Sequence, residues 1–311
     1  MKEVQNMNKC IYNAIVLVIT ALLVMAAPVA AYTIDGDCSD WGIYPTNDPS
    51  NPDRLDDSSL IPTIGGISYV IDNDNADWAE MAVSGNMSNF TGPEWCDIEA
   101  MYVDDDSDYI YVLLITSMPK DGMWYYEHIQ PGDLALDFDS GTGIEYGVKI
   151  VQNDEQGEFG IVGAIYSDPV WKVLDYSSGR SDITNIIGGD WVGNATIKYT
   201  GTGGDPIPGI AVPDGPVDSG LPWDTFGLMK PEYGDAYDDN PPIPNEVIEI
   251  AIPKSALNLQ NTMLNLQSSP SCGNGIIKLE SVTLVPEFIT LAIPVLSLLG
   301  LAFYMRRREQ K

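Results

Sequence analysis

The chain has 311 residues, of which 15 are basic and 45 acidic, and its formal net charge is −30. Six of the basic and two of the acidic residues lie in two apolar ends, residues 1–31 and 288–311, so the region between these ends carries a charge near −34. So large a negative charge repels nucleic acid and anionic lipid, which excludes a nucleic-acid-binding function, and it attracts cations. Two interpretations stay open, a surface adapted to salt and a surface that binds divalent metal.

The N-terminus has the pattern of an export signal. Lys2 and Lys9 precede an apolar run over residues 14–27, which is followed by small residues. This order predicts a signal peptide helix over residues 1–31 that is cleaved before Tyr32. The alternative is a retained N-terminal membrane helix, and both interpretations place the middle of the chain outside the cytoplasm.

Three short acidic clusters are candidate calcium sites. Calcium takes six to eight oxygen ligands, which closely spaced carboxylates on a turning loop can supply. The clusters are Asp35, Asp37 and Asp40; Asp72, Asp74 and Asp77; and Asp137, Asp139 and Glu145. The alternative for each cluster is a solvated acidic turn, and none matches a complete EF-hand loop. Structural calcium is the one cofactor that we predict.

The region between the ends also has three cysteines and three glycosylation sequons. Cys96 and Cys272 flank strand-like segments, so we predict a disulfide between them and a leftover thiol at Cys38. The sequon asparagines, which are candidates for glycosylation on surface loops, are Asn86, Asn89 and Asn194.

Short apolar segments separated by Gly, Pro, Asn and Asp predict an all-β fold, a single antiparallel β-sandwich of jelly-roll or immunoglobulin-like type. Residues 109–116 are apolar or aromatic on both alternating faces, which predicts a central strand. The aspartate-rich residues 104–108 predict a hairpin turn before it. The predicted strands are 98–103, 109–116, 134–138, 146–151, 159–166, 247–252 and 276–285.

An aromatic loop is the candidate ligand site. Trp124, Tyr125 and Tyr126 lie between a Gly and a Pro-Gly turn, so at least one ring is expected to face outward and to offer its face to a sugar. The alternative is that alternate rings pack into the sandwich. His128 is the only histidine of the sequence and no nucleophile motif accompanies it, so we do not predict an enzyme.

The C-terminus is a tail in three parts. The motif Pro286-Glu287-Phe288 opens an uncharged segment, residues 288–305, whose 18 residues rise roughly 27 Å as a transmembrane helix. The basic residues that follow it, as the positive-inside rule requires, are Arg306, Arg307 and Arg308. This tail resembles the PEF-CTERM sorting signal of archaeal surface proteins, a relative of the bacterial PEP-CTERM signal. The resemblance implies cleavage by an archaeosortase; the alternative is an ordinary tail anchor.

Motifs in the region between the ends carry a second resemblance. They are the opening motif at 34–41, the strand-hairpin-strand at 98–112 and the late strand at 246–257. Together they resemble extracellular sandwich domains related to DOMON and to family-nine carbohydrate-binding modules. Residues 131–137, residues 145–148 and Cys272-Gly273-Asn274 are similar to a subset of such domains that carry PEP-CTERM-type tails.

The predicted organisation is a signal peptide over 1–31, a β-sandwich over 32–284 with a Gly, Pro and Asp-rich loop at 200–244, and a sorting tail over 285–311. We predict a non-enzymatic, calcium-stabilised protein of the outer cell surface. Its expected partners are the membrane, an archaeosortase-type enzyme and glycans of the cell envelope. The alternatives are a carbohydrate-binding receptor or adhesin that uses the loop at 123–128, and a secreted hydrolase.

Overall fold

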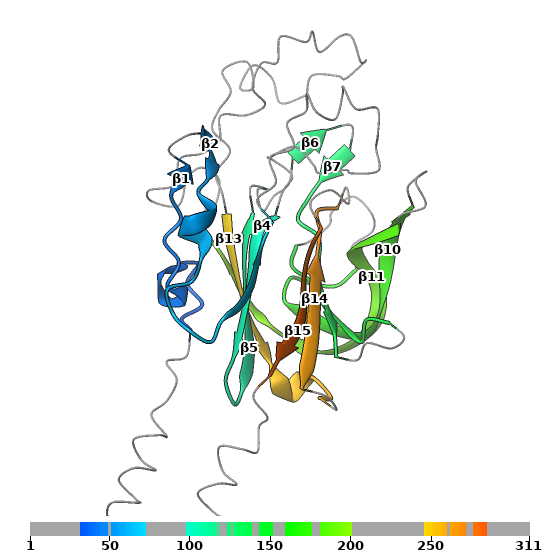
Figure 1. Cartoon of the computed structure of the whole chain (residues 1–311). Coiled ribbons are helices and arrows are strands. Elements are labelled where there is room, and N and C mark those ends of the chain that lie inside the picture. The colour runs from blue at the N-terminus through cyan, green and yellow to red at the C-terminus, as the bar shows by residue number, and fades with distance from the viewer. Residues whose placement is uncertain are drawn as a thin grey trace, which may run out of the picture. The chain divides into compact units, whose positions relative to one another are not determined.

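The computed structural model describes twelve stretches of the chain, and Tyr32–Leu284 form one compact unit. Strands dominate it, in two large antiparallel sheets and two small ones (Figure 1), so the predicted all-β sandwich is confirmed at this level. The helices predicted at the two ends lie outside the described residues. Those residues are 32–48, 51–72, 98–116, 118, 123–125, 127–138, 143–151, 159–175, 181–200, 246–259, 262–271 and 276–284.

The first large sheet has five strands in the order β12-β13-β5-β4-β3. Their bounds are Thr196–Tyr199 (β12), Glu246–Pro253 (β13), Tyr109–Thr116 (β5), Ile98–Asp105 (β4) and Ser68–Ile71 (β3). β5 lies in the middle, and the short turn between β4 and β5 is the aspartate-rich hairpin. Both the central strand and the hairpin turn were predicted from the sequence, and both predictions are confirmed.

The second large sheet has six strands in the order β11-β10-β9-β8-β14-β15. Their bounds are Ser181–Asn194 (β11), Ala164–Asp175 (β10), Tyr146–Val148 (β9), Leu134–Asp137 (β8), Met263–Ser268 (β14) and Ile277–Thr283 (β15). The two small sheets pair Asn47–Asp48 (β1) with Asn51–Leu55 (β2), and Met123–Tyr125 (β6) with Glu127–Ile129 (β7).

The main core lies between the two large sheets. Along β5 the inward side chains are Ile110, Val112 and Leu114, and they belong to the same buried cluster as Leu136 of β8 and Leu266 of β14. Burial of large apolar side chains of this kind contributes about 1.5–3 kcal/mol each to folding. The period-2 alternation of strand side chains explains why every second residue of β5 serves this core.

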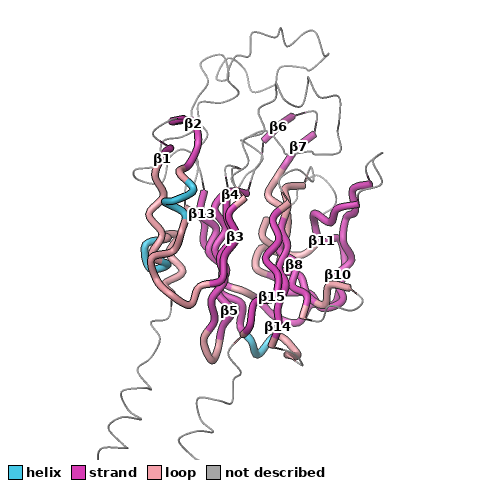
Figure 2. Tube along the Cα trace, viewed as in Figure 1, coloured by secondary structure: helices cyan, strands magenta, loops and turns pink. Residues whose placement is uncertain are grey.

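A second core covers the opposite face of the five-stranded sheet. There Tyr111, Leu113 and Ile115 of β5 cluster with Trp41 and Leu60 of the N-terminal segment. This segment, residues 32–67, carries the 3₁₀ helices η1 (Ser39–Trp41) and η2 (Asp57–Leu60) and lies beside the sheet (Figure 2). β5 is therefore apolar on both faces because each face has its own core.

One predicted strand is wrong in position. A strand was predicted over residues 159–166, whereas β10 begins at Ala164 and runs to Asp175. Gly160 and Gly163 have φ angles of 80° and 87°, which belong to the left-handed region that β-strands do not use. The residues before β10 therefore turn, and the strand that follows pairs with β11 in a long hairpin that we did not predict.

Candidate functional site

The opening motif is held on the five-stranded sheet by one buried carboxylate, that of Glu249. Its Oε2 accepts hydrogen bonds from the backbone N–H groups of Asp35 at 2.9 Å and Gly36 at 2.5 Å. Its Oε1 accepts a third from Nε1 of Trp41 at 2.9 Å. Both Glu249 and Trp41 are fully buried. Hydrogen bonds that charged groups accept are stronger than neutral ones, so this carboxylate fastens a loop to a strand more than 200 residues away.

The glycine of the opening motif is required by the same contact. Gly36 has a φ angle of +86°, and a Cβ atom there would lie 2.6 Å from Cγ2 of Thr200. A side chain at this position would therefore clash and strain the backbone. Glycine at this position thus fits both the backbone turn and the close approach to Thr200.

The three acids of the opening motif bind nearby backbone groups. Asp35 Oδ1 accepts from the N–H of Asp37, and Asp37 Oδ1 accepts from the N–H of Ser39, both at 2.9 Å. Asp40 Oδ2 accepts from the N–H of Thr33 at 2.9 Å. Among the residues that the structure describes, no group of three or more His, Cys, Asp or Glu side chains can hold a metal ion. The carboxylate oxygens of this cluster order the turn itself, and calcium at this place stays a prediction.

Tyr32, the first described residue, is packed into an aromatic cluster. Its ring centroid lies 4.1 Å from that of Trp41 and 5.1 Å from that of Tyr111. Its hydroxyl donates to Asp104 Oδ2 at 2.6 Å. The mature N-terminus predicted from the sequence thus coincides with a residue whose side chain is fixed by contacts to the sheet.

Burial shifts the acids of this region toward their protonated forms. Desolvation raises the pKa of Glu249, and the three donated hydrogen bonds only partly offset the effect. Desolvation also raises the pKa of Asp40, with a further increase from Asp35 and Asp37. Cys38 is a buried free thiol, and burial raises its pKa to about 12, so it is a poor nucleophile.

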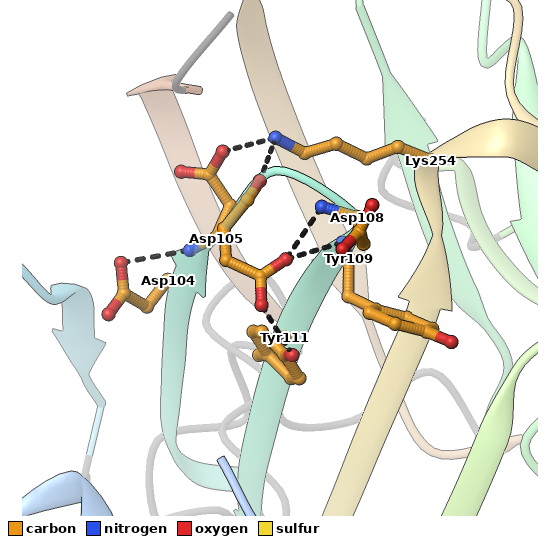
Figure 3. A network of polar contacts seen from close by, with 7 residues as sticks. Asp104, Asp105, Asp108, Tyr109, Tyr111 and Lys254 are labelled. Atoms are coloured by element: carbon orange, nitrogen blue, oxygen red, sulfur yellow. Dashed lines mark hydrogen bonds and ion pairs between the residues drawn. The ribbon is translucent and has the colours of Figure 1, made fainter. Parts of the chain in front are cut away.

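The hairpin between β4 and β5 is fastened by a second buried charge (Figure 3). Lys254, at the start of η5 (Lys254–Ala256), donates from Nζ to Asp105 Oδ2 at 2.6 Å and to the carbonyl of Asp106 at 2.5 Å. Asp106 Oδ1 accepts from the N–H groups of Asp108 and Tyr109, and its Oδ2 accepts from the Tyr111 hydroxyl. The acidic turn is thus ordered by its own backbone and by one lysine.

A third buried charge lies at the edge of β8. Asp133 is 2% exposed, and its Oδ2 lies 3.0 Å from Nζ of Lys149. The N–H groups of Ile150 and Ile186 also donate to its carboxylate, at 2.8 and 2.7 Å. Burial raises the pKa of Asp133 although Lys149 opposes the shift. The carboxylate joins β8 to the segment after β9 and to β11.

The other calcium candidates are only partly described. Glu145 Oε2 accepts from the N–H of Phe138 at 2.8 Å, so it closes the loop that Asp137 begins. Asp137 Oδ2 lies 3.4 Å from the donating Nδ2 of Asn265. Asp139, Asp74 and Asp77 lie outside the described residues, and Asp72 is the last residue described before that gap.

Other candidate residues fall on small elements or beyond the described chain. Trp124 and Tyr125 belong to β6, where Trp124 pairs with His128 of β7. Asn194 is exposed at the end of β11. The candidates that lie outside the described residues are Tyr126, Cys96, Cys272, Asn86, Asn89, Pro286, Glu287, Phe288, Arg306, Arg307 and Arg308.

Sequence reasoning missed Glu249, Asp133, Lys149 and Lys254 as fastening residues. Each is a charged residue in or beside a largely apolar strand, as in the run over 246–253. A charged residue that interrupts such a run and is nevertheless buried must have a partner. The sequence contained this signal, but it did not show which residues are the partners.

The fold and these contacts define an all-β sandwich whose buried charges join its own segments. Residues 285–309, directly after the sandwich, match the PEF-CTERM archaeal protein sorting domain. The match confirms the sorting tail expected from the three-part pattern and indicates a protein sorted to the cell surface. No curated protein and no solved structure matches the chain. The resemblance to DOMON and carbohydrate-binding modules stays a prediction.

The predicted transmembrane segment at 288–305 lies outside the described residues. Within the part of the chain that the structure describes, no helix has the length and apolar character needed to cross a membrane.

Proposed function

We propose that the chain is a non-enzymatic protein of the archaeal cell surface, exported by its N-terminal signal and processed at its tail by an archaeosortase. The observation that carries this proposal is the match of residues 285–309 to the archaeal sorting domain, which begins directly after Leu284, the last described residue of the sandwich. In this function the sandwich is the part displayed outside the cell, and the tail is the signal that directs it there.

The uses of the buried charges support a structural role. Glu249, Asp105 and Asp133 are the kinds of desolvated acids that active sites often contain. Here their oxygens accept from backbone N–H groups, an indole and lysines of the same domain. An acid that is fully engaged in holding strands together is poorly placed to act on a substrate.

Calcium belongs to this proposal as a stabilising ligand of the loop between β8 and β9. Asp137 and Glu145 lie at the two ends of that loop, and Glu145 already closes it through the Phe138 N–H. Carboxylate oxygens on a turning loop are the donors that calcium prefers. Asp137 and Glu145 would hold the ion there, together with Asp139 of the same loop.

The tail can be tested by substitution in an archaeal host. Replacing Pro286, Glu287 and Phe288 by alanine removes the motif and leaves the apolar segment and the arginines intact. We expect the variant to accumulate with its complete C-terminus, whereas the parent chain loses it. A matched control is Arg307→Lys, which keeps the charge. Loss of the tail from the alanine variant would show that the processing enzyme does not recognise this motif.

A second candidate function, carbohydrate binding, is favoured by the position of the aromatic loop. Among the described residues, β6 and β7 pair with each other in a separate two-stranded sheet, and their backbones take no part in the ladders of the two large sheets. Trp124→Ala combined with Tyr126→Ala should abolish binding to a glycan array. Retained binding would remove this loop as the ligand site.

A further inference from the structure

The sequon at Asn194 lies at a corner of the sandwich. Asn194 is the last residue of β11 and Thr196 the first of β12, so the chain crosses here from the six-stranded to the five-stranded sheet. Asn194 and Thr196 are both exposed. Ala195 between them is half-buried, and its N–H donates to the carbonyl of Gly163 at 2.7 Å. The backbone of the sequon is therefore fixed while its two reactive side chains face solvent.

Trp191 is a large side chain that is mostly exposed near Asn194. It is 62% exposed, although tryptophan is among the side chains that gain most from burial. In the register of the β10–β11 hairpin, Trp191 pairs with Tyr166 and Asn194 pairs with Ala164. Ile165, between these two partners, belongs to the main core. The register shift between Ile165 and Tyr166 inserts one extra residue of β11 between Trp191 and Gly193. Trp191 and Asn194 therefore share the face of their partners Tyr166 and Ala164, which is opposite the main core.

A direct contact joins the indole to the asparagine. Trp191 Nε1 donates to Asn194 Oδ1 at 3.3 Å. This bond uses Oδ1 of the amide, whereas a sugar attaches to Nδ2 of the same amide. The ring of Trp191 consequently lies next to the position of the first sugar.

We propose that Asn194 is N-glycosylated and that the exposed face of Trp191 is the platform on which the first sugar of the glycan packs. The apolar C–H face of a pyranose ring is complementary to the electron-rich face of an indole. An aromatic residue three positions before a modified asparagine is held in place for this contact by the Nε1–Oδ1 bond. The exposure of Trp191 is then explained, because the glycan covers it in the modified protein.

The modification itself needs a donor from outside the chain. The Nδ2 atom forms a bond to the anomeric carbon of a lipid-phosphate-linked oligosaccharide, the bond from that carbon to the phosphate oxygen breaks, and Nδ2 loses one proton to a base of the transferase. Such donors act outside the cytoplasm, so this inference rests on the proposed export of the chain. The hydroxyl of Thr196 supplies the third position of the sequon.

The experiment uses the full chain, produced in an archaeal host and isolated from the cell envelope. Peptide mass measurement gives the occupancy of Asn194, and thermal unfolding gives the effect of the sugar. The parent is compared with Thr196→Ala, which removes the sequon and leaves both Asn194 and Trp191 in place. It is also compared with Trp191→Ala, with Trp191→Phe, which keeps an aromatic face, and with the double variant Trp191→Ala/Thr196→Ala.

We expect a glycan on Asn194 in the parent and its loss in Thr196→Ala, with an unfolding midpoint lowered by about 2–4 °C. In the Trp191→Ala background, removing the sequon should change the midpoint by less than about 1 °C, and Trp191→Phe should recover most of the difference. These results would show that the sugar stabilises the domain through its contact with the indole.

Three outcomes overturn the inference. An unmodified Asn194 in a chain that has lost its signal peptide contradicts the modification while leaving the proposed function intact. An unmodified Asn194 in a chain that still carries residues 1–31 contradicts both. A glycosylated Asn194 whose removal shifts the midpoint equally with and without Trp191 shows that the indole is not the platform.

Discussion

At the scale of single residues, Glu249 is the side chain on which the opening motif depends. It accepts three hydrogen bonds while fully buried in β13. Glu249→Gln keeps the shape but replaces one acceptor oxygen by an amide NH₂ group, which is itself a donor and faces a donor. We expect a loss of roughly 1–3 kcal/mol in the free energy of unfolding, because a buried donor is left unsatisfied. Chemical unfolding measures it, with Glu280→Gln on the exposed side of β15 as the matched control.

The pKa of Glu249 also predicts how stability depends on pH. An acid whose pKa is raised by folding binds its proton more tightly in the folded state, so its contribution is fully present below the unfolded pKa and is lost as the pH rises through the folded pKa. The free energy of unfolding should therefore fall as the pH rises above about 4. Asp40 and Asp133 act in the same direction.

Urea unfolding at a series of pH values measures this slope. Glu249→Gln should show a shallower decrease than the parent, since one titrating acid is gone. A slope unchanged by the substitution would show that Glu249 has the same pKa in the folded and unfolded chain.

The role of the opening motif was only partly predictable from the sequence. Trp41 lies at the end of the opening motif that the sequence analysis singled out at 34–41, and it is fully buried. The acids around it were predicted to hold calcium, which stays a prediction, and one oxygen of each accepts from a backbone N–H group of the same turn. The decisive partner, Glu249, is 208 residues from Trp41 in sequence. Local spacing reveals that a turn is acidic, but it does not reveal a distant strand that supplies the acceptor.

At the scale of elements, the hairpin between β4 and β5 is fastened by Lys254. Lys254→Met removes the ammonium and leaves the nearly buried Asp105 carboxylate without the lysine. We expect a loss of about 3–5 kcal/mol in the free energy of unfolding, the usual effect of breaking one side of a buried ion pair. The double variant Lys254→Met/Asp105→Leu should recover most of that loss. If the double variant is as unstable as the single one, the charge of Asp105 is not the cause.

Strands were predicted well where both alternating faces of a segment are apolar, and poorly where glycines interrupt the segment. β5 and β13 are long apolar runs, and their predicted limits lie within one residue of the observed ones. β11 contains Gly188 and Gly189 followed by Asp190, which reads as a turn in the sequence. In the structure, register shifts in the β10–β11 pairing accommodate these residues within a 14-residue strand.

At the scale of the whole molecule, the sandwich has a covered outer face that the sequence did not predict. The covering segment has little regular structure, and its apolar residues are scattered among prolines and aspartates. Trp41, Ile43, Leu55 and Leu60 therefore show no periodicity, although all four are buried on the five-stranded sheet. The fold class follows from strand patterns, whereas the extra layer depends on contacts that no periodic pattern encodes.

Calcium stabilisation is a property of the whole domain and is tested as one. A ligand that binds only the folded state raises the unfolding midpoint in proportion to the logarithm of its concentration above the dissociation constant. We expect EDTA to lower the midpoint and excess Ca²⁺ to restore it, with Mg²⁺ as the control ion. An Asp137→Asn variant should lose the response. A midpoint that chelator does not change would contradict all three acidic clusters as calcium sites.

The central claim, an exported domain whose tail is a processing signal, is tested most directly by the intact mass of the protein isolated from archaeal cell envelopes. The account predicts a chain that begins at Tyr32 and ends close to the Pro286-Glu287-Phe288 motif, with any added mass removable as glycan or anchor. A mass that includes residues 1–31 and the complete tail through Lys311 would contradict it.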